Sequence, residues 1–454
     1  MGMEIDRTER IAPYRRWGGR LRMALIVGVT LLTAGLPLGQ RVSARGAGTP
    51  VSGQRVTLQF FGAGTNAQWA PVFKAYEKLH PNVTIQSQGV PFADYQNTLV
   101  QRFSAGGSGI DIFMVDPTYI PIFTQRGFLL DLTGAFASKV RGVLNQNDID
   151  GATYMGRLRT MPIWDSTQIL YYNSDLLRKA GVQPPGPAPQ DRWTWERTIQ
   201  AAQKVRQAGA KYGFAFEQVD RYYQLQPLPE SLGGGPGVTG KNLLTVDITN
   251  PAWQKAATWY GNIYRAGVAP RGLSNLSQTF AAFQAGQLGF YVGQPTGIQY
   301  FSAAKGLHYG YAPQPYFAGG KPVTPSESWH WGVYAQTSHQ QAALDFLAYA
   351  GLTTEGSLQA AAQFPMPANL AAAKIALVKQ LAQSTPAMQG VDTLIRYELA
   401  HTAVRRPRSL GYLQLEEYVT RAWSDIRDGV DPKTVLQQTQ AQLTSTFSRI
   451  QAPS

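Results

Sequence analysis

The chain has 454 residues, of which 44% are hydrophobic and 15% are charged, a balance that predicts a globular protein of two or three domains. It contains no cysteine, which excludes disulfides, thiol catalysis and cysteine-based metal sites. The five histidines are scattered without metal-ligand spacing, so we expect no metal and no cofactor. The formal net charge is +13, but no run of Lys and Arg is interleaved with aromatic residues, so we expect no nucleic-acid partner.

The amino-terminal segment has the pattern of a secretory signal peptide. Four arginines between residues 15 and 22 precede an apolar run at 23–38, and small residues follow at 42–44. The run is short and interrupted by Pro and Gly, which favours a signal peptide over a membrane span. We therefore expect residues 1–44 to direct export to the periplasm or the extracellular face of the membrane. Without cysteine, the exported chain has no thiol to carry a lipid anchor.

Residues 55–116 alternate between apolar strands and amphipathic helices. Strands are predicted at 55–61, 83–86 and 110–115, with a helix after each of the first two. This order predicts a parallel sheet with right-handed crossovers, in which ligands bind outside the carboxyl ends of the strands. The residues at those ends are Phe61, Gln88 and Asp116.

The stretch 160–177, T-M-P-I-W-D-S-T-Q-I-L-Y-Y-N-S-D-L-L, reads as a mostly buried strand followed by a helix start. Trp164 offers a flat apolar face, and Asp165 beside it offers hydrogen-bond acceptors. A sugar ring uses both, because its C–H face stacks on an aromatic ring and its hydroxyls donate to a carboxylate. The alternative is a core tryptophan beside a capping aspartate, and this stretch alone leaves the two open.

Further along, the chain is predicted to leave the first α/β unit and return to it. Gly293–Gly297 is a glycine and proline break that would let the chain cross between lobes. Residues 328–335, S-W-H-W-G-V-Y-A, have the alternation of a strand, and most of the remainder is helical.

A glycoside hydrolase is one alternative, since Asp116, Asp165 and Glu327 could supply a pair of carboxylates. Neither a G-x-S-x-G motif nor a Walker A motif is present. Carboxylates and tryptophans in one cleft also describe a sugar-binding site without catalysis.

Eight segments, in this order across nearly the whole exported chain, resemble the extracellular solute-binding proteins of family 1, the sugar-binding components of ABC importers. Its maltose/trehalose-binding branch is the most similar. The segments are G-I-D-I-F at 109–113 with Asp116 beyond it, G-F-L-L-D-L at 127–132, M-P at 161–162 leading to L-Y-Y-N-S-D-L-L at 170–177, W-T-W-E at 193–196, F-Q-A-G-Q at 283–287, A-A-L-D-F-L at 342–347, P-M-P-A at 365–368 and D-G-V-D-P at 428–432.

The resemblance implies an α/β, two-lobed periplasmic-binding-protein fold of type II-like topology, with a hinge and a ligand cleft between the lobes. It assigns residues 55–164 and 306–350 to an N-terminal lobe, and residues 165–305 and 351–454 to a C-terminal lobe. The candidate ligand-binding residues are Phe61, Asp116, Tyr119, Trp164, Asp165, Tyr223, Gln294, Trp329 and Arg406.

Two departures from that branch bear on the ligand. Gln294 stands where a tryptophan is common, and Pro365-Met366-Pro367 replaces a usual Pro-Thr-Arg. A missing stacking ring and a missing arginine would change the size or the ring identity of the sugar.

The resemblance implies a binding protein rather than an enzyme. It would capture a di- or oligosaccharide as a monomer, close by hinge motion, and be recognised by the permease subunits of an ABC importer. The alternatives are a binding protein for a phosphorylated or acidic solute, favoured by Arg405, Arg406 and Arg408, and a secreted glycoside hydrolase.

Overall fold

The computed structural model describes residues 55–107, 109–326, 328–362, 366–376 and 386–451. The predicted signal peptide at 1–44 lies outside these residues, as do Glu327 and Pro365. Across the described ranges, every helix is too short or too polar to span a bilayer.

The first sheet has six strands in the order β15-β6-β14-β3-β1-β2. Strands β1, β2 and β3 run parallel, with helices between them, which confirms the predicted crossovers. Strands β14, β6 and β15 extend the sheet in antiparallel fashion, so the whole sheet is mixed. Its elements are β1 (Val56–Ala63), α1 (Asn66–Leu79), β2 (Val83–Val90), α2 (Phe92–Ser104), β3 (Ile112–Val115), β6 (Met161–Asp165), β14 (Trp329–Val333) and β15 (Met366–Pro367).

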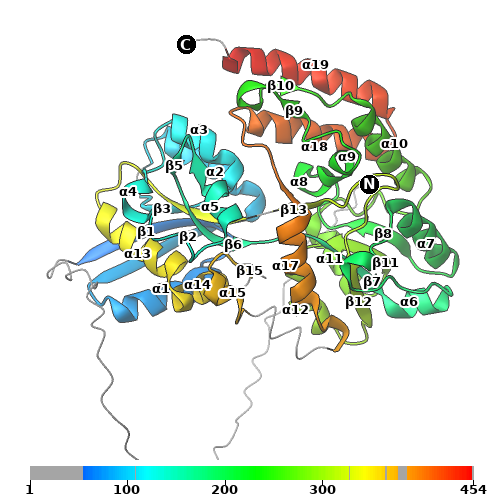
Figure 1. Cartoon of the computed structure of the whole chain (residues 1–454), viewed down its shortest axis with the longest axis horizontal. Helices are drawn as coiled ribbons and strands as arrows, with labels where there is room; N and C mark the ends of the chain where they lie inside the picture. Colours follow the sequence, from blue (N-terminus) through cyan, green and yellow to red (C-terminus); the bar gives the residue numbers. More distant parts are fainter. Residues whose placement is uncertain (1–54, 108, 327, 363–365, 377–385, 452–454) are drawn as a thin grey trace, which may run out of the picture. The chain divides into compact units, whose positions relative to one another are not determined.

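Local capping explains why α1 follows β1 directly. Gly64 has a φ of 95°, which a residue with a side chain rarely adopts, and it turns the chain. Thr65 and Gln68 then form a reciprocal capping box at the start of the helix. Helix α1 packs with α13 (Gln340–Leu352) and α14 (Thr354–Ala360) beside the first sheet (Figure 1).

The stretch 160–177 forms two strands where one was predicted. Strand β6 lies in the first sheet, whereas β7 (Ile169–Asn173) lies in the second. Residues Ser166, Thr167 and Gln168 connect the two strands and are buried. The Gln168 amide donates to the Gln224 side chain at 2.8 Å, which satisfies one buried polar group of the connection. The chain therefore crosses from the first sheet to the second within this stretch, at Ser166–Gln168.

The second sheet has four strands in the order β12-β7-β11-β8. Strands β11 and β8 are parallel, and β7 is antiparallel to both of its neighbours. The bounds are β8 (Tyr212–Phe216), β11 (Leu288–Gly293) and β12 (Tyr309–Pro313).

Sheet pairing differs from the predicted lobe division at two places. Strand β12 pairs with β7, so Tyr309–Pro313 belongs to the second sheet, although 306–350 was assigned to the first lobe. Strand β15 pairs with β6 in the first sheet, although 351–454 was assigned to the second lobe. The break at Gly293–Gly297 leads into α12 (Gly297–Ser302), and the return to the first sheet comes only after β12.

A parallel two-stranded ribbon lies on this return path. Strand β13 (Thr324–Ser326) precedes β14 and pairs with β16 (Ala403–Arg405). Helix α17 (Val391–His401) precedes β16 and contacts β12 of the second sheet. The ribbon thus pairs the segment that leads into β14 of the first sheet with the segment that follows α17, a helix in contact with the second sheet.

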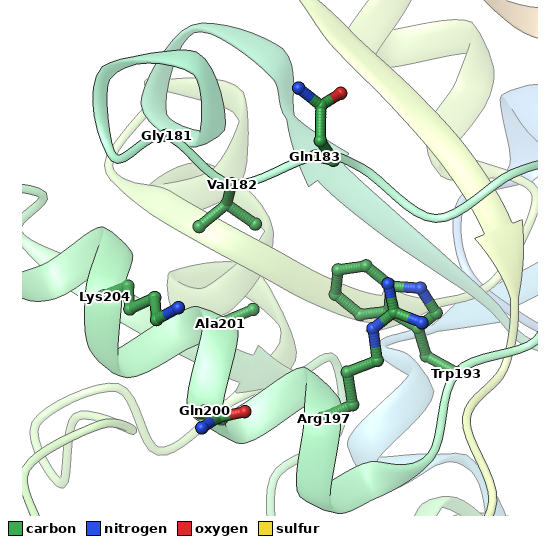
Figure 2. Close-up of a pocket in the computed structure, with 8 residues that line it drawn as sticks. All are labelled: Gly181, Val182, Gln183, Trp193, Arg197, Gln200, Ala201 and Lys204. Atoms are coloured by element: carbon green, nitrogen blue, oxygen red, sulfur yellow. The ribbon is translucent and has the colours of Figure 1, made fainter.

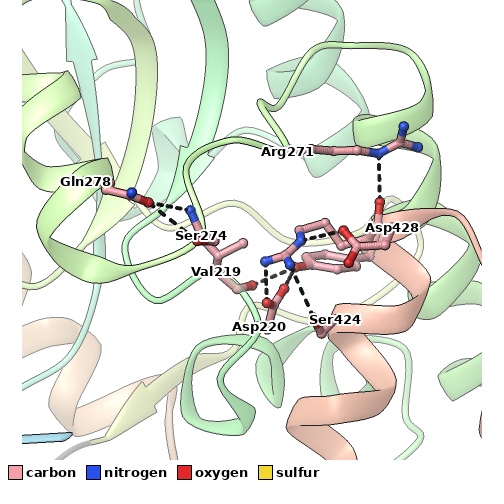
Figure 3. A network of polar contacts seen from close by, with 9 residues as sticks. Val219, Asp220, Arg271, Ser274, Gln278, Ser424 and Asp428 are labelled. Atoms are coloured by element: carbon pink, nitrogen blue, oxygen red, sulfur yellow. Dashed lines mark hydrogen bonds and ion pairs between the residues drawn. The ribbon is translucent and has the colours of Figure 1, made fainter. Parts of the chain in front are cut away.

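Three helices, α10 (Pro251–Arg265), α18 (Tyr412–Asp428) and α19 (Pro432–Gln451), pack against one another. Their junction is held by a polar network around Arg427, which pairs with Asp220 and whose carbonyl accepts from Arg271 Nε at 3.0 Å (Figure 3). The Tyr260 hydroxyl donates to the Val219 carbonyl at 2.6 Å in the same network. Burial of these polar groups is tolerated because they bond to each other.

The remaining elements are short or connect those above. They are η1 (Pro117–Tyr119), α3 (Ile120–Gln125), α4 (Thr133–Phe136), α5 (Gln146–Ala152), β4 (Thr153–Tyr154), β5 (Arg157–Leu158), α6 (Ser174–Lys179), η2 (Pro189–Asp191), α7 (Trp195–Gln207), α8 (Tyr222–Leu225), α9 (Pro227–Ser231), β9 (Val238–Thr239), η3 (Lys241–Leu243), β10 (Thr245–Val246), α11 (Leu276–Gln284), α15 (Leu370–Ala373) and η4 (Pro386–Met388).

Candidate functional site

A buried ion pair joins the end of β3 to the segment between β16 and α18. Asp116 follows β3 and caps η1, accepting from the Thr118 amide at 3.1 Å. The Arg406 guanidinium meets both Asp116 carboxylate oxygens, at 2.8 Å to Oδ2 and 2.9 Å to Oδ1. Asp116 is 1% exposed and Arg406 is 4% exposed. This is the two-point geometry that fits a planar guanidinium to a carboxylate.

Three tyrosines surround the Arg406 guanidinium. Its carbon lies 5.5 Å from the centre of the Tyr223 ring and 5.8 Å from that of the Tyr412 ring. Arg406 also donates to the Tyr412 hydroxyl at 3.1 Å, and the Tyr119 ring lies 5.9 Å from the Tyr412 ring. Burial raises the pKa of Tyr119 well above its usual value, with Glu416 and Asp116 adding to the shift. The Tyr119 hydroxyl therefore stays protonated.

A column of aromatic rings lies on β6 and β14. Trp164 and Trp329 are direct partners in the strand pairing, and their rings stack with centres 6.3 Å apart. The Trp69 ring also stacks on Trp164, with ring centres 5.7 Å apart. Trp329 meets the edge of Phe92 at 5.7 Å, and Phe92 is 46% exposed. The column therefore runs from the core at Trp69 to the surface at Phe92.

The Asp165 carboxylate is engaged by the protein. Its Oδ1 accepts from the Ser166 amide at 2.7 Å and from the Ser326 hydroxyl at 3.2 Å. A further hydrogen bond links it to the carboxyl of Asp148, and burial raises the pKa of Asp165. These contacts correspond to the capping alternative for Asp165 more than to a carboxylate open to sugar hydroxyls.

Two other candidate residues pack away from the Asp116–Arg406 pair. The Phe61 ring stacks on Tyr95 at 5.5 Å and lies under the Arg102 guanidinium at 4.7 Å. Gln294 follows β11, and its carbonyl accepts from the Tyr171 hydroxyl at 2.9 Å. Phe61 is thus 1% exposed in the core of the first sheet.

Arg405, Arg406 and Arg408, the arginines that favoured an anionic solute, all interact with other groups of the protein. Arg406 pairs with Asp116, and Arg408 donates to the carbonyls of Gly151 and Thr153 at 3.0 and 2.6 Å. Arg405 lies beside the buried carboxyls of Asp148 and Asp165 and lowers their pKa values against the larger effect of burial.

Four residues around the ion pair and the column were not foreseen. Arg221 Nε contacts Glu416 at 3.2 Å, and its guanidinium lies 5.2 Å from the centre of the Phe92 ring. Tyr412 and Glu416 lie on the same helix, α18. A sequence signal existed only for Phe92, because it follows the carboxyl end of β2, where ligand contacts are expected.

The carboxylates proposed for hydrolysis do not form a free pair in the described structure. Asp116 is bound to Arg406, Asp165 to Asp148 and Ser326, and Glu327 lies outside the described residues. Among the described residues, no group of three or more His, Asp or Glu side chains is placed to bind a metal ion.

A surface pocket of about 180 Å³ lies elsewhere, between α7 and the segment that follows α6 (Figure 2). The Arg197 guanidinium covers the Trp193 ring at 4.2 Å, and Lys204 lies further along α7. Trp193 is 5% exposed, and the Arg197 guanidinium already covers one face of its ring. This pocket contains none of the predicted ligand-binding residues.

Comparison with known proteins places the chain in a family. Residues 62–355 match the family of bacterial extracellular solute-binding proteins. A Deinococcus radiodurans protein named as a probable ABC transporter-binding protein is 29% identical over 269 residues, which cover 55% of this chain and 60% of that protein.

Two solved structures share the fold. The first is an ABC substrate-binding protein from Listeria monocytogenes in complex with cycloalternan, with a TM-score of 0.76, 20% identity, and coverage of 87% of this chain and 100% of that chain. The second is the GacH receptor of Streptomyces glaucescens, solved unliganded and with acarbose, with a TM-score of 0.74, 20% identity, and coverage of 87% and 99%. The two-lobed fold expected from the sequence is confirmed, and this chain belongs to the bacterial extracellular solute-binding proteins.

Proposed function

We propose that the protein captures a di- or oligosaccharide as the binding component of an ABC importer, binding without catalysis and working as a monomer with membrane permease subunits. One observation supports this most: an aromatic column reaches the surface at Phe92, and Arg221 and Tyr223 connect it to a buried Asp–Arg pair that joins the end of β3 to the segment after β16. Aromatic faces stack on sugar rings, and charged hydrogen-bonding groups recognise sugar hydroxyls. Two structurally similar proteins that bind cycloalternan and acarbose agree with it.

The proposed movement is a hinge closure of two lobes that follow sheet membership. The lobe of the first sheet would hold β1, β2, β3, β6, β14 and β15, and the lobe of the second would hold β7, β8, β11 and β12. The connection at Ser166–Gln168 and the β13–β16 ribbon would serve as hinge segments. Proposed ligand contacts are Phe92, Asp116, Tyr119, Tyr223, Trp329 and Arg406, with Trp164 behind Trp329.

A thermal-shift screen over mono-, di- and oligosaccharides tests the proposal. A ligand at 100 times its dissociation constant should stabilise the protein by about 2.7 kcal/mol. Its affinity should be the same at low and high salt, because a neutral sugar makes no screened charge pair. Preference for phosphorylated or uronic sugars with strong salt dependence would favour the acidic-solute alternative, and turnover of a glycan would indicate a hydrolase.

Trp329→Ala should weaken binding of the sugar found in that screen by about 1–3 kcal/mol, because a large apolar face is lost. Trp329 also packs on Trp164, so this variant should be less stable without ligand. Trp329→Phe keeps an aromatic face and should retain most of the affinity. Calorimetry below the melting temperature of each variant measures this, and equal affinity of the alanine variant and the native protein would assign Trp329 to the core alone.

A further inference from the structure

Two buried carboxyls meet where the chain leaves the first sheet. Asp148 lies on α5, and Asp165 is the last residue of β6, which α5 contacts. They are 2% and 6% exposed, and a hydrogen bond links their carboxyls. The Oδ2 atom of Asp148 receives no hydrogen bond from any donor in the described part of the chain. Since an ionised carboxylate only accepts, this contact requires a proton on one of the two.

Arg405 supplies a compensating positive charge to the pair. Asp165 accepts from Ser326, at the end of β13, and Ser326 pairs in register with Arg405 at the end of β16. Arg405 is the charged group that faces both carboxyls. One shared negative charge is matched by this arginine, whereas a second buried negative charge would be opposed by desolvation and by like-charge repulsion.

A further titratable group, His330, lies near Arg405 and Arg408. His330 on β14 is 0% exposed, with Nδ1 at 2.8 Å from the Thr160 hydroxyl and Nε2 at 3.2 Å from the Ser328 hydroxyl. Burial, helped by Arg405 and Arg408, holds the pKa of His330 well below its usual value. His330 is therefore held toward its neutral form by burial and by these two arginines.

We propose that Asp148 and Asp165 share one proton and form a proton-dependent clasp, which fastens α5 to the crossing between the two sheets and loosens as the pH rises. The clasp touches β6 and the β13–β16 ribbon, the segments along which the chain passes between the sheets. The stability of this crossing would thus respond to the pH outside the cell. The inference does not depend on which solute is bound.

The direction of the pH effect on stability follows from the raised pKa of Asp148. Burial, with Asp165 adding to it, raises the pKa of Asp148 well above its usual value. The unfolded chain loses this proton near pH 3.9, while the folded protein keeps it. The stabilisation is therefore complete at low pH and is lost as the pH rises from about 4 through the folded pKa. One proton changes the ratio of folded to unfolded protein by at most about tenfold per pH unit.

Urea unfolding of the full chain at half-unit steps from pH 5 to 8 tests the clasp, with Asp148→Asn as the key variant. An asparagine amide donates to Asp165 as the protonated carboxyl does, but it does not titrate. We expect the native protein to lose stability with rising pH relative to Asp148→Asn, approaching tenfold per unit in the folded ratio over part of the range. Asp150→Asn, on the exposed side of the same helix, should follow the native protein.

Other buried acids titrate in all three proteins, so only the difference between native protein and variant reports on the pair. Parallel pH dependence of the native protein and Asp148→Asn would overturn the proposal. Should Asp148→Asn fail to fold, Asp165→Asn removes the same shared proton from the other side. That variant should likewise lose the extra pH dependence, and a slope equal to that of the native protein would also overturn the clasp.

Discussion

Arg406→Met should lower the free energy of unfolding by about 3–5 kcal/mol, because it leaves the Asp116 carboxylate buried without its partner. Both oxygens of Asp116 meet the guanidinium, and both side chains are almost fully buried. The loss should appear in urea unfolding at neutral pH in the absence of any ligand.

The double variant Asp116→Asn with Arg406→Met separates the lost partner from other effects of the arginine. Asparagine keeps an oxygen for the Thr118 amide and carries no charge, so the double variant should recover most of the stability. Arg421→Met is a matched control. Arg421 forms an ion pair with Glu417, and their side chains are 63% and 64% exposed, so this pair should contribute less than about 1 kcal/mol to stability. If Arg406→Met were no more harmful than Arg421→Met, the pair would have no structural role.

Trp164→Ala should destabilise the protein by about 3–5 kcal/mol, as expected when a buried tryptophan leaves a cavity. Its ring is 2% exposed and stacks on Trp69 and Trp329, so little space is open for the neighbours to collapse into. Thermal and urea unfolding of the unliganded protein measure the loss.

Two comparisons show whether the effect comes from the buried column. Trp164→Phe keeps a ring against the two neighbours and should lose clearly less stability than the alanine variant. Tyr300→Ala removes an aromatic ring from a position that is 47% exposed, and should change stability by roughly 0.5 kcal/mol. A Trp164→Ala loss as small as that of Tyr300→Ala would contradict the packing described here.

Local sequence patterns were sufficient to predict the first α/β unit and the protein family. The alternation of apolar strands and amphipathic helices between residues 55 and 115 predicted β1, α1, β2, α2 and β3 in the right order and direction. Such patterns work because the spacing of apolar residues reflects local backbone geometry, with a period of two in a strand and of three to four in a helix. The ordered short motifs likewise identified a solute-binding protein, which the family match confirms.

Pairing between distant segments could not be predicted in the same way. The run at Tyr309–Pro313 is apolar enough for either sheet, and only its register with β7 assigns it to the second. The stretch 160–177 reads as one strand because it is apolar and rich in aromatic residues, but its polar connection, Ser166–Gln168, divides it into two. That connection is buried through partners such as Gln224, which the local pattern does not reveal.

By itself, then, the sequence determined the family, the first sheet's parallel core and the presence of aromatic and acidic residues suited to a sugar. Only the tertiary structure decided how those residues are used. Asp116 meets Arg406 across 290 positions of the chain, and Asp165 turns to Asp148 and Ser326 instead of facing outward. The reason is physical: a buried charge must find its partner in space, and chain neighbours do not reveal which distant group the fold brings to it.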